Sequence, residues 1–271
     1  MPCCWDALSA RLIERAGFLL TFMSGFAVAA SRLALPDTQL ISYAEMLDQG
    51  RSLCGAVSIP VIGDADTGYG NALNVKRTVL GYAAAGFAAA MIEDQLAPKR
   101  CGHTRGKQVV SRSEALARIR AAVDARDEGA GILILARTDA AAVHGLDEAI
   151  ARADAFRDAG ADILFVEAPR SEDELARVAG ALRGAPLMAN LVEGGDTPLL
   201  PPERLAALGY RIAAYPLTLL SVAVHALGGA LETLRAGAHP AESERVSFEA
   251  LRELVGFPAY DAAAARYASE D

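Results

Sequence analysis

Short, continuously apolar runs alternate with alanine-rich, amphipathic segments along most of the chain. Such runs are typical of strands buried on both faces, as in a parallel sheet covered by helices. The expected strands are 18–23, 59–65, 89–93, 132–138, 163–168, 186–191 and 210–215. The expected helices are 7–16, 74–85, 113–126, 146–159, 171–182, 202–208, 217–236, 247–255 and 260–268. This alternation predicts a parallel α/β fold.

Polar or charged residues stand at the carboxyl end of nearly every expected strand. They are Ser24, Asp64, Asp66, Glu93, Asp94, Arg137, Asp139, Glu167 and Asn190. A β/α barrel builds its active site at this face from several strands, whereas a doubly wound sheet gathers such residues at one switch point. No G-x-G-x-x-G or P-loop motif follows an expected strand, so nucleotide binding has no support. We therefore predict a TIM-type (β/α)8 barrel.

The strand pattern falls one short of the eight that a barrel needs. The chain opens at Pro2-Cys3-Cys4-Trp5-Asp6, which is typical of a turn that leads into the first helix. Two alternatives follow: the first strand is missing, or residues 1–4 form a short stub of it. We expect the barrel over residues 1–236, and a C-terminal helical appendix of the same domain over 237–271.

Composition excludes several classes of function. The formal net charge is −8, which argues against an electrostatic nucleic-acid binder. The four cysteines have no metal-ligand spacing, which indicates free thiols in a reducing compartment. The apolar run 17–30 is too short to cross a bilayer, and no signal peptide is recognisable. We expect a cytoplasmic protein without a membrane or nucleic-acid partner.

Asp64 and Asp66 stand two residues apart at a strand end, so their side chains point the same way. Paired carboxylates at a barrel mouth suit Mg²⁺, which takes few protein ligands and keeps several waters. The alternative is that Asp66 caps the next segment and Asp64 pairs with a cation. Glu93 and Glu167 at two further strand ends favour the metal, because buried carboxylates must be paired or bind a metal.

Other residues at the same face offer substrate contacts. Arg137 can clamp a carboxylate or simply neutralise its acidic neighbours. Ser24-Gly25-Phe26 forms a turn whose backbone N–H groups could hold a carboxylate, although taken alone it is more often just a turn. Asn190 is either a cap or a hydrogen-bond donor to substrate.

The segment Lys99-Arg100-Cys101-Gly102-His103 places a thiol and an imidazole beside two cations. Neighbouring cations favour the thiolate, which makes a cysteine useful as a proton donor or nucleophile. The glycine allows close approach of the backbone to a ligand. The alternative is a surface loop with a chance cysteine.

Together these residues resemble the isocitrate lyase and phosphoenolpyruvate mutase superfamily, over nearly the whole chain from about residue 2 to 233. The matching stretches are Trp5–Leu12 (WDALSARL), Ser24-Gly25, Leu35-Pro36-Asp37, Asp64–Asn71 (DADTGYGN), Glu93-Asp94-Gln95, Lys99–His103 (KRCGH), Ala136–Ala140 (ARTDA), Val166-Glu167-Ala168 and Ala189-Asn190. The resemblance implies a barrel whose C-terminal helices are exchanged between paired subunits. It further implies a homotetramer, as a dimer of dimers, and Mg²⁺-dependent chemistry on 2-oxo and 2-hydroxy acids, with Mn²⁺ as a possible substitute.

The resemblance also implies roles for individual residues. It makes Asp64 the direct Mg²⁺ ligand, supported by Asp37, Asp66 and Glu93. The implied substrate contacts are Ser24, Gly25, Phe26, Gly102, Arg137 and Asn190. The implied catalytic residues are Cys101, His103, Arg137 and Glu167. In this scheme Cys101 is the general acid, on a loop over residues 98–107 that closes over the substrate.

The Cys-Gly-His sequence favours carbon–carbon cleavage, because members with phosphonopyruvate chemistry mostly lack it. We expect a lyase that cleaves a 2-hydroxy di- or tricarboxylate of 2-alkylmalate, dimethylmalate or methylisocitrate type. Isocitrate and methylisocitrate lyases carry tyrosine where this chain has Phe22, which leaves the general base unassigned. The alternatives are a carboxyphosphonoenolpyruvate or phosphoenolpyruvate phosphonomutase, an oxaloacetate hydrolase or decarboxylase, and a catalytically inert truncated barrel.

Overall fold

The structure is a computed structural model that describes residues 1–102 and 104–268. The chain divides into two compact units, Met1–Leu219 and Leu220–Asp271. We call the first the barrel unit and the second the C-terminal unit. The division between them falls within one long helix.

The barrel unit contains short parallel strands that follow one another in sequence order. They are β1 Cys3–Cys4, β2 Thr21–Met23, β3 Val61–Asp64, β4 Ala89–Glu93, β5 Leu133–Thr138, β6 Ile163–Val166, β7 Met188–Asn190 and β8 Ile212–Ala214. β1 to β6 form one sheet, and β7 and β8 form another. Isolated parallel bridges join the two sheets, Leu164 to Leu187 and Pro2 to Tyr215. The strands therefore succeed one another around a ring, as the barrel prediction requires.

The first strand is present as a short stub, which is the second of the two predicted alternatives. Cys3 and Cys4 pair in parallel with Phe22 and Met23 of β2. On the other side, the Cys3 N–H donates to the Tyr215 carbonyl at 3.2 Å. The strand is so short that an apolar periodicity could not reveal it. Its position between β2 and the end of β8 covers strand edges that would otherwise be unpaired.

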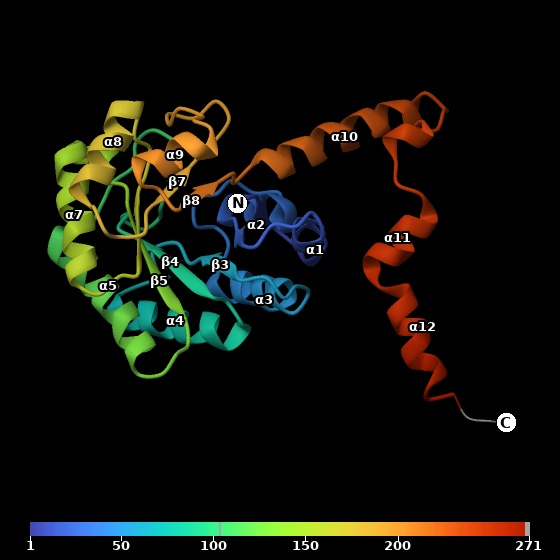
Figure 1. Ribbon diagram of the computed structural model, residues 1–271, viewed down its shortest axis with the longest axis horizontal. Helices are drawn as coiled ribbons and strands as arrows, with labels where there is room; N and C mark the ends of the chain where they lie inside the picture. The colour runs from blue at the N-terminus through green and yellow to red at the C-terminus, as the bar shows by residue number, and fades with distance from the viewer. Residues whose placement is uncertain (103, 269–271) are drawn as a thin grey trace. The chain divides into compact units, whose positions relative to one another are not determined.

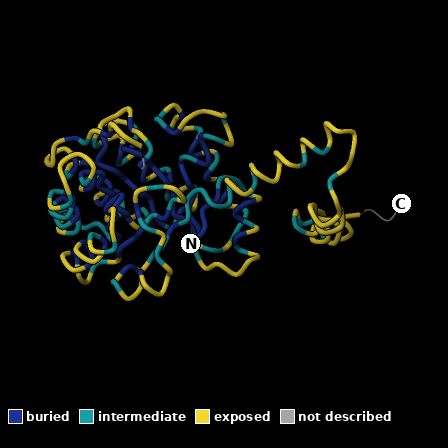
Figure 2. The backbone as a smooth tube through the Cα atoms, turned by 90° about the horizontal axis from the view of Figure 1, so that it is seen from above, coloured by how far each residue is buried: buried dark blue, intermediate teal, exposed yellow. Residues whose placement is uncertain are grey.

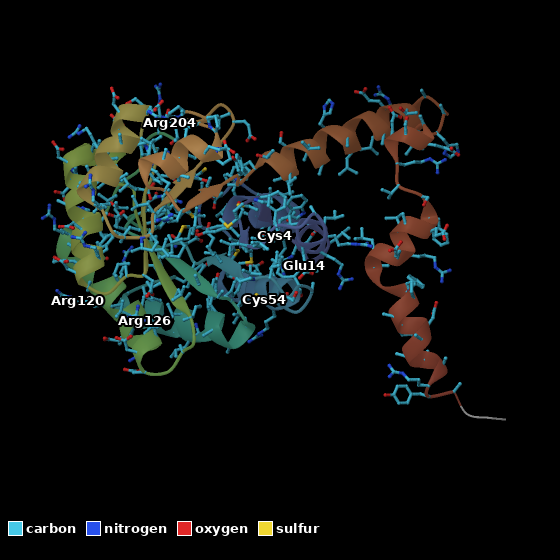
Figure 3. The ribbon with its side chains drawn as sticks, in the orientation of Figure 1. Cys4, Glu14, Cys54, Arg120, Arg126 and Arg204 are labelled. Atoms are coloured by element: carbon cyan, nitrogen blue, oxygen red, sulfur yellow. The ribbon has the colours of Figure 1, made fainter. Side chains whose placement is uncertain are left out.

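Helices connect the strands and surround them (Figure 1). In the barrel unit they are α1 Ala7–Arg15, α2 Gly25–Leu33, α3 Tyr43–Cys54, α4 Ala72–Ala85, α5 Arg112–Asp127, α6 Ala141–His144, α7 Leu146–Asp158, α8 Glu172–Ala181 and α9 Pro202–Leu208. Sequence periodicity did not predict α2, α3 or α6. A signal for α3 was present, because Ser42 and Glu45 form a capping box at its start. In Figure 3, Cys54 marks the other end of this helix.

Successive side chains of each strand enter two different apolar clusters, because neighbouring residues of a strand face opposite ways. One cluster lies between the strands and the surrounding helices, and Figure 2 shows buried backbone enclosed by more exposed outer segments. The other cluster fills the inside of the ring. Its buried members are Cys3, Phe22, Ile62, Ala89, Met91, Leu135, Ile163, Phe165, Met188 and Ala214. The barrel is thus a packed core with the strand ends free to carry chemistry.

The C-terminal unit consists of helical segments with many exposed apolar side chains. α10 (Thr218–Arg235) begins in the barrel unit, and η1 (Glu242–Glu244), α11 (Phe248–Val255) and α12 (Phe257–Ala265) follow. Exposed apolar residues include Val222, Leu227, Leu231, Phe248 and Tyr260. Among the described residues, no helix combines the length and apolar character needed to cross a membrane.

The packing around Gly63 in β3 predicts a steric penalty for a methyl group. A Cβ at Gly63 would lie 2.7 Å from Tyr82 and 2.8 Å from Phe87, both buried ring carbons. We expect Gly63→Ala to lower the free energy of unfolding by about 1–3 kcal/mol, as overpacking does. Urea denaturation measures this.

Gly180 in α8 is the matched control, because nothing lies within 4 Å of the position that a Cβ would take there. Gly180→Ala should instead stabilise the protein by about 0.5–1 kcal/mol, since alanine is the better helix former. Equal effects at the two sites would contradict the tight packing around Gly63.

Candidate active site

A pocket of about 530 Å³, counting space open to solvent, lies at the carboxyl ends of the barrel strands. Its polar lining comprises Ser24, Asp37, Asp64, Lys99, Cys101, Arg137, Glu167 and Asn190. Its remaining lining comprises Cys3, Phe22, Phe26, Met91, Gly102, Phe165, Met188, Val192, Ala214, Pro216 and Leu217. The pocket therefore joins a charged side to an apolar side.

The period of the strand explains why these polar groups converge. Each polar residue that a strand end supplies stands two positions after an apolar residue of the inner cluster, so both face the inside of the ring. The pairs are Phe22 and Ser24, Ile62 and Asp64, Met91 and Glu93, Leu135 and Arg137, Phe165 and Glu167, and Met188 and Asn190. The apolar members form the floor on which the polar members stand.

Asp64 is the carboxylate that ends β3 and faces the pocket. Its Oδ2 accepts a hydrogen bond from the Gly25 N–H at 3.1 Å, and its Oδ1 accepts one from the Asp66 N–H at 3.1 Å. Burial, with the negative charge of Asp66, raises the pKa of Asp64 to about 6. A methyl group at Gly25 would lie 2.5 Å from Oδ2, so only glycine allows this approach.

Lys99 lies between two further carboxylates predicted for the metal site. Its Nζ is 2.5 Å from Asp37 Oδ1 and 2.9 Å from Asp66 Oδ1. The lysine side chain is 3% exposed. Burial alone would lower the pKa of Lys99, but the charges of Asp66 and Asp37 outweigh it and raise that pKa well above its usual value. The ammonium is therefore a permanent cation within this carboxylate cluster.

Glu93 is the buried carboxylate that ends β4. Both of its side-chain oxygens are buried and, within the described part of the chain, accept no hydrogen bond. Its nearest cation is Arg137, whose Nε lies 3.4 Å from Oε2. Burial raises the pKa of Glu93 well above its usual value, against the opposing effect of Arg137. A buried carboxylate whose oxygens accept no hydrogen bond requires a further polar partner besides this cation.

The carboxylates fit a hydrated cation better than a fully protein-bound one. Within the described residues, no three His, Cys, Asp or Glu side chains are arranged so that they alone could hold a metal ion. Mg²⁺ does not need such a cage, because it binds through one or two carboxylates and keeps several waters. Asp64 on the pocket wall, with the orphaned oxygens of Glu93 behind it, suits an ion of this kind.

Arg137 is the cation that the strands themselves supply. It forms two hydrogen bonds to Asp139, from Nε at 2.8 Å and from Nη2 at 3.0 Å. Its Nη2 also lies 3.1 Å from Glu167 Oε2. The guanidinium is buried, which would lower its pKa, yet its acidic neighbours raise that pKa well above the usual value. Both predicted roles of Arg137, carboxylate clamp and neutraliser, are compatible with this geometry.

Glu167 and Asn190 complete the polar side. Asn190 Nδ2 donates to Glu167 Oε2 at 3.4 Å, and the Ala168 N–H donates to Glu167 Oε1 at 3.0 Å. Ser24 caps α2, where its side chain accepts from the Ala27 N–H at 3.3 Å. Ser24 and Phe26 at the amino end of α2 line the pocket, but the Ser24 N–H donates to the Cys4 carbonyl and the Gly25 N–H donates to Asp64.

Loop 98–107 reaches the same pocket through Cys101 and Gly102. A methyl group at Gly102 would lie 2.4 Å from Glu167 Oε2 and 2.5 Å from Arg137 Nη2. The loop backbone therefore packs directly on the polar side of the site. Cys101 is half-buried. His103, which was predicted to be catalytic, lies outside the described residues.

Most of the predicted site residues that the structure describes converge here, and three of these described residues do not line the pocket. They contact residues that do line it. The Gly25 N–H donates to Asp64, Asp66 forms an ion pair with Lys99, and Glu93 forms an ion pair with Arg137. Sequence reasoning treated Lys99 as a cation beside the Cys101 thiol, whereas the structure pairs it with Asp37 and Asp66, and it gave Lys107 no role. Lys99 and Lys107 carried no signal of burial, because a lysine beside glycine and arginine usually lies in solvent.

Comparison with known proteins identifies the family. Residues 1–235 match the family described as phosphoenolpyruvate phosphomutase. The 2,3-dimethylmalate lyase of Eubacterium barkeri is 46% identical over 226 residues, which cover 83% of this chain and 78% of the relative. The 2-methylisocitrate lyase of Halalkalibacterium halodurans is 42% identical over 226 residues, which cover 83% of this chain and 74% of the relative. The chloroplastic carboxyvinyl-carboxyphosphonate phosphorylmutase of Arabidopsis thaliana is 42% identical over 275 residues, covering 99% and 80%.

Solved structures agree. A 2,3-dimethylmalate lyase, described as a PEP mutase/isocitrate lyase superfamily member, superimposes with a TM-score of 0.93 at 38% identity, covering 98% of this chain and 89% of that chain. An oxaloacetate acetylhydrolase in complex with 3,3-difluorooxalacetate superimposes with a TM-score of 0.94 at 37% identity, covering 100% of this chain and 92% of that chain. A phosphonopyruvate hydrolase in complex with oxalate and Mg²⁺ superimposes with a TM-score of 0.87 at 33% identity, covering 98% of this chain and 93% of that chain. The resemblance inferred from the motifs is confirmed: this chain belongs to the phosphoenolpyruvate mutase/isocitrate lyase superfamily.

Proposed function

We propose that the protein is a Mg²⁺-dependent carbon–carbon lyase. Its substrate is a 2-hydroxy di- or tricarboxylate of 2-alkylmalate, dimethylmalate or methylisocitrate type, and its products are a 2-oxo acid and a carboxylate. The observation that carries the proposal is one pocket lined at once by Asp64, by Arg137 and by the thiol-bearing residue Cys101. Relatives named as dimethylmalate and methylisocitrate lyases support it.

The charged side of the pocket would suit a dicarboxylate once a divalent cation is bound, because Asp37, Asp64 and Glu167 outnumber Lys99 and Arg137 there. Asp64 would hold Mg²⁺, with Asp37, Asp66 and Glu93 around its waters, and Mn²⁺ would be an acceptable substitute. When bound, the metal would bind the substrate's carboxylate and hydroxyl and lower the pKa of that hydroxyl.

The residues of the chain itself would bind the substrate, stabilise the developing charge, supply a proton and exclude water. Arg137 offers a positive charge where the leaving fragment becomes an enolate-like carboxylate. At the start of α2 the Gly25 N–H holds Asp64 and the Ser24 N–H donates to the Cys4 carbonyl, so the backbone donor offered to a substrate carboxylate is the Phe26 N–H. Cys101 delivers a proton to the carbon released when the bond breaks. Loop 98–107 covers the pocket and excludes water from the carbanion.

The apolar side of the pocket favours an alkyl-substituted substrate. Phe22, Phe26, Val192 and Leu217 line it. An alkyl group placed against this wall would leave water, which is favourable by roughly 0.8 kcal/mol for each buried CH₂. Phe22 therefore adds apolar contact where a tyrosine would add a hydroxyl. The wall supports the alkylmalate type over a fully polar substrate.

Two enzyme alternatives have specific support. The Arabidopsis relative is named as a carboxyvinyl-carboxyphosphonate phosphorylmutase, and one structural neighbour is an oxaloacetate acetylhydrolase. Phosphonomutase and oxaloacetate hydrolase or decarboxylase activities are therefore the second candidates. The inert-barrel alternative rested on a missing first strand, and β1 occupies that position.

Mass spectrometry of reaction products separates these candidates. The enzyme with Mg²⁺ is incubated with a panel of 2-alkylmalates, 2-methylisocitrate, oxaloacetate and phosphonates. Cleavage of a 2-hydroxy acid to a 2-oxo acid and a carboxylate supports the lyase. Turnover of oxaloacetate or of a phosphonate alone favours the corresponding alternative. No turnover of any panel member, with metal bound, favours an inert protein.

We also propose that the protein is a homotetramer, a dimer of dimers that exchanges its C-terminal helices. Exposed apolar side chains on α10 and α11, such as Leu227, Leu231 and Phe248, support this, because large apolar surfaces usually mark protein contacts. Light scattering of the full chain measures the mass, and a monomer at micromolar concentration would contradict the proposal.

The role of Cys101 predicts a large loss of turnover without its thiol. We expect Cys101→Ser to lower kcat by about 10²–10⁴-fold, the usual contribution of a positioned proton donor, with little change in KM. Cys54→Ser is the control, because Cys54 is a half-buried thiol at the end of α3. Product formation by Cys101→Ser at the wild-type rate would rule out this role for the thiol.

The role of Asp64 predicts that its removal abolishes stabilisation by the metal. Saturating Mg²⁺ should raise the Tm of the wild-type protein, because a ligand that binds only the folded state stabilises it. Asp64→Asn should show no such rise. Asp48→Asn, at an exposed carboxylate of α3, should keep the wild-type response. An unchanged Mg²⁺ effect in Asp64→Asn would remove Asp64 from the metal site.

A further inference from the structure

Lys107 ends loop 98–107, and the proposed reaction assigns it no task. Its side chain is only 3% exposed. Its Nζ donates a hydrogen bond to the Gly102 carbonyl and lies 2.9 Å from Asp139 Oδ1. Burial of an ammonium is costly unless it is paired and hydrogen-bonded, so these two contacts decide where the side chain lies.

Asp139 gives Lys107 a fixed anchor. Both carboxylate oxygens of Asp139 accept hydrogen bonds from Arg137. The Asp139 N–H donates to Asp94 Oδ1 at 2.9 Å, and Asp94 is held in turn by Thr138 and Arg152. The anchor is therefore part of the rigid strand end and not of the loop.

Gly102 is the other end of the bridge. Its backbone has no room for a methyl group against Glu167 and Arg137. The adjacent Cys101 carbonyl accepts hydrogen bonds from Thr104, at 3.0 Å from the N–H and 2.8 Å from Oγ1. A cation that holds the Gly102 carbonyl thus holds the whole turn that bears Cys101.

We propose that Lys107 is a positioning residue. By bridging the Gly102 carbonyl to Asp139, it seats the Cys101–Gly102 turn on the polar side of the pocket. The bridge also brings a second cation to a region where Asp139, Glu93 and Glu167 surround the single guanidinium of Arg137. Its effect on turnover rests on the proposed lyase function, whereas its effect on the position of Cys101 does not.

Alkylation of Cys101 tests the proposal without any turnover. The wild type, Lys107→Met and Lys76→Met are treated with iodoacetamide, and each modified peptide is quantified by mass spectrometry. Lys76→Met is the matched control, because Lys76 forms an ion pair with Glu128 on the outer surface. Cys54 serves as an internal reference for general loosening of the fold.

We expect Lys107→Met to raise the alkylation rate of Cys101 by about tenfold or more, the effect of losing a charge-assisted hydrogen bond. The Cys54 rate should stay at the wild-type value, and Lys76→Met should behave as the wild type. Lys107→Arg should return the Cys101 rate toward the wild type, because it restores the cation. An unchanged Cys101 rate, or a parallel rise at Cys54, would overturn the proposal.

Lys107→Gln replaces Lys107→Met if the latter does not fold. Because glutamine keeps a donor for the Gly102 carbonyl but loses the charge that pairs with Asp139, the Cys101 rate should rise above the wild type but less than in Lys107→Met. For lyase turnover, Lys107→Met should lower kcat by about tenfold, because the displaced turn carries the proton donor Cys101. Faster alkylation in a protein that cleaves no panel substrate would uphold the bridge and reject the lyase function. An unchanged Cys101 alkylation rate in a Lys107→Met variant of an active lyase would reject the bridge and uphold the lyase function.

Discussion

The balance of charge at the carboxyl ends of the strands is the constraint on which the site depends. Buried carboxylates gather there, namely Asp37, Asp64, Asp66, Glu93, Asp139 and Glu167. Arg137 is the cation that the strands provide, and Lys99 and Lys107 come from loop 98–107. Unpaired buried charge is costly, so the position of the loop and the charge of the site are coupled. A bound divalent cation would add to the same balance.

The charged side chains lie directly above a well-packed apolar cluster inside the barrel, and this cluster holds them in place. The inner cluster, with Phe22, Met91 and Phe165 among its members, fills the ring below the charged layer. Register brings Glu93 opposite Arg137 on adjacent strands, so acid and base meet without help from a loop. The stub strand β1 matters here, because it joins β2 to the end of β8 and keeps the ring continuous.

Much of this was predictable from the chain alone, and the misses have physical causes. Continuous apolar runs predicted β2 to β8, because strands buried on both faces leave no other pattern. β1 was ambiguous, since two residues carry no periodicity. α2 was missed because its apolar sequence after Ser24 resembles a continuation of the strand. The convergence of Asp64, Arg137, Glu167 and Asn190 was predictable, because parallel strands end at one face.

The sequence by itself determined which chemical groups stand at that face and which family they belong to. It did not determine how those groups pair. Lys107 lies 32 residues from Asp139, and Lys99 lies 62 residues from Asp37. Any of the nearby cations could neutralise any of these acids, so local sequence cannot choose between them. Only the tertiary structure decides, because the strength of a buried ion pair depends on the distance and burial that the folded chain imposes.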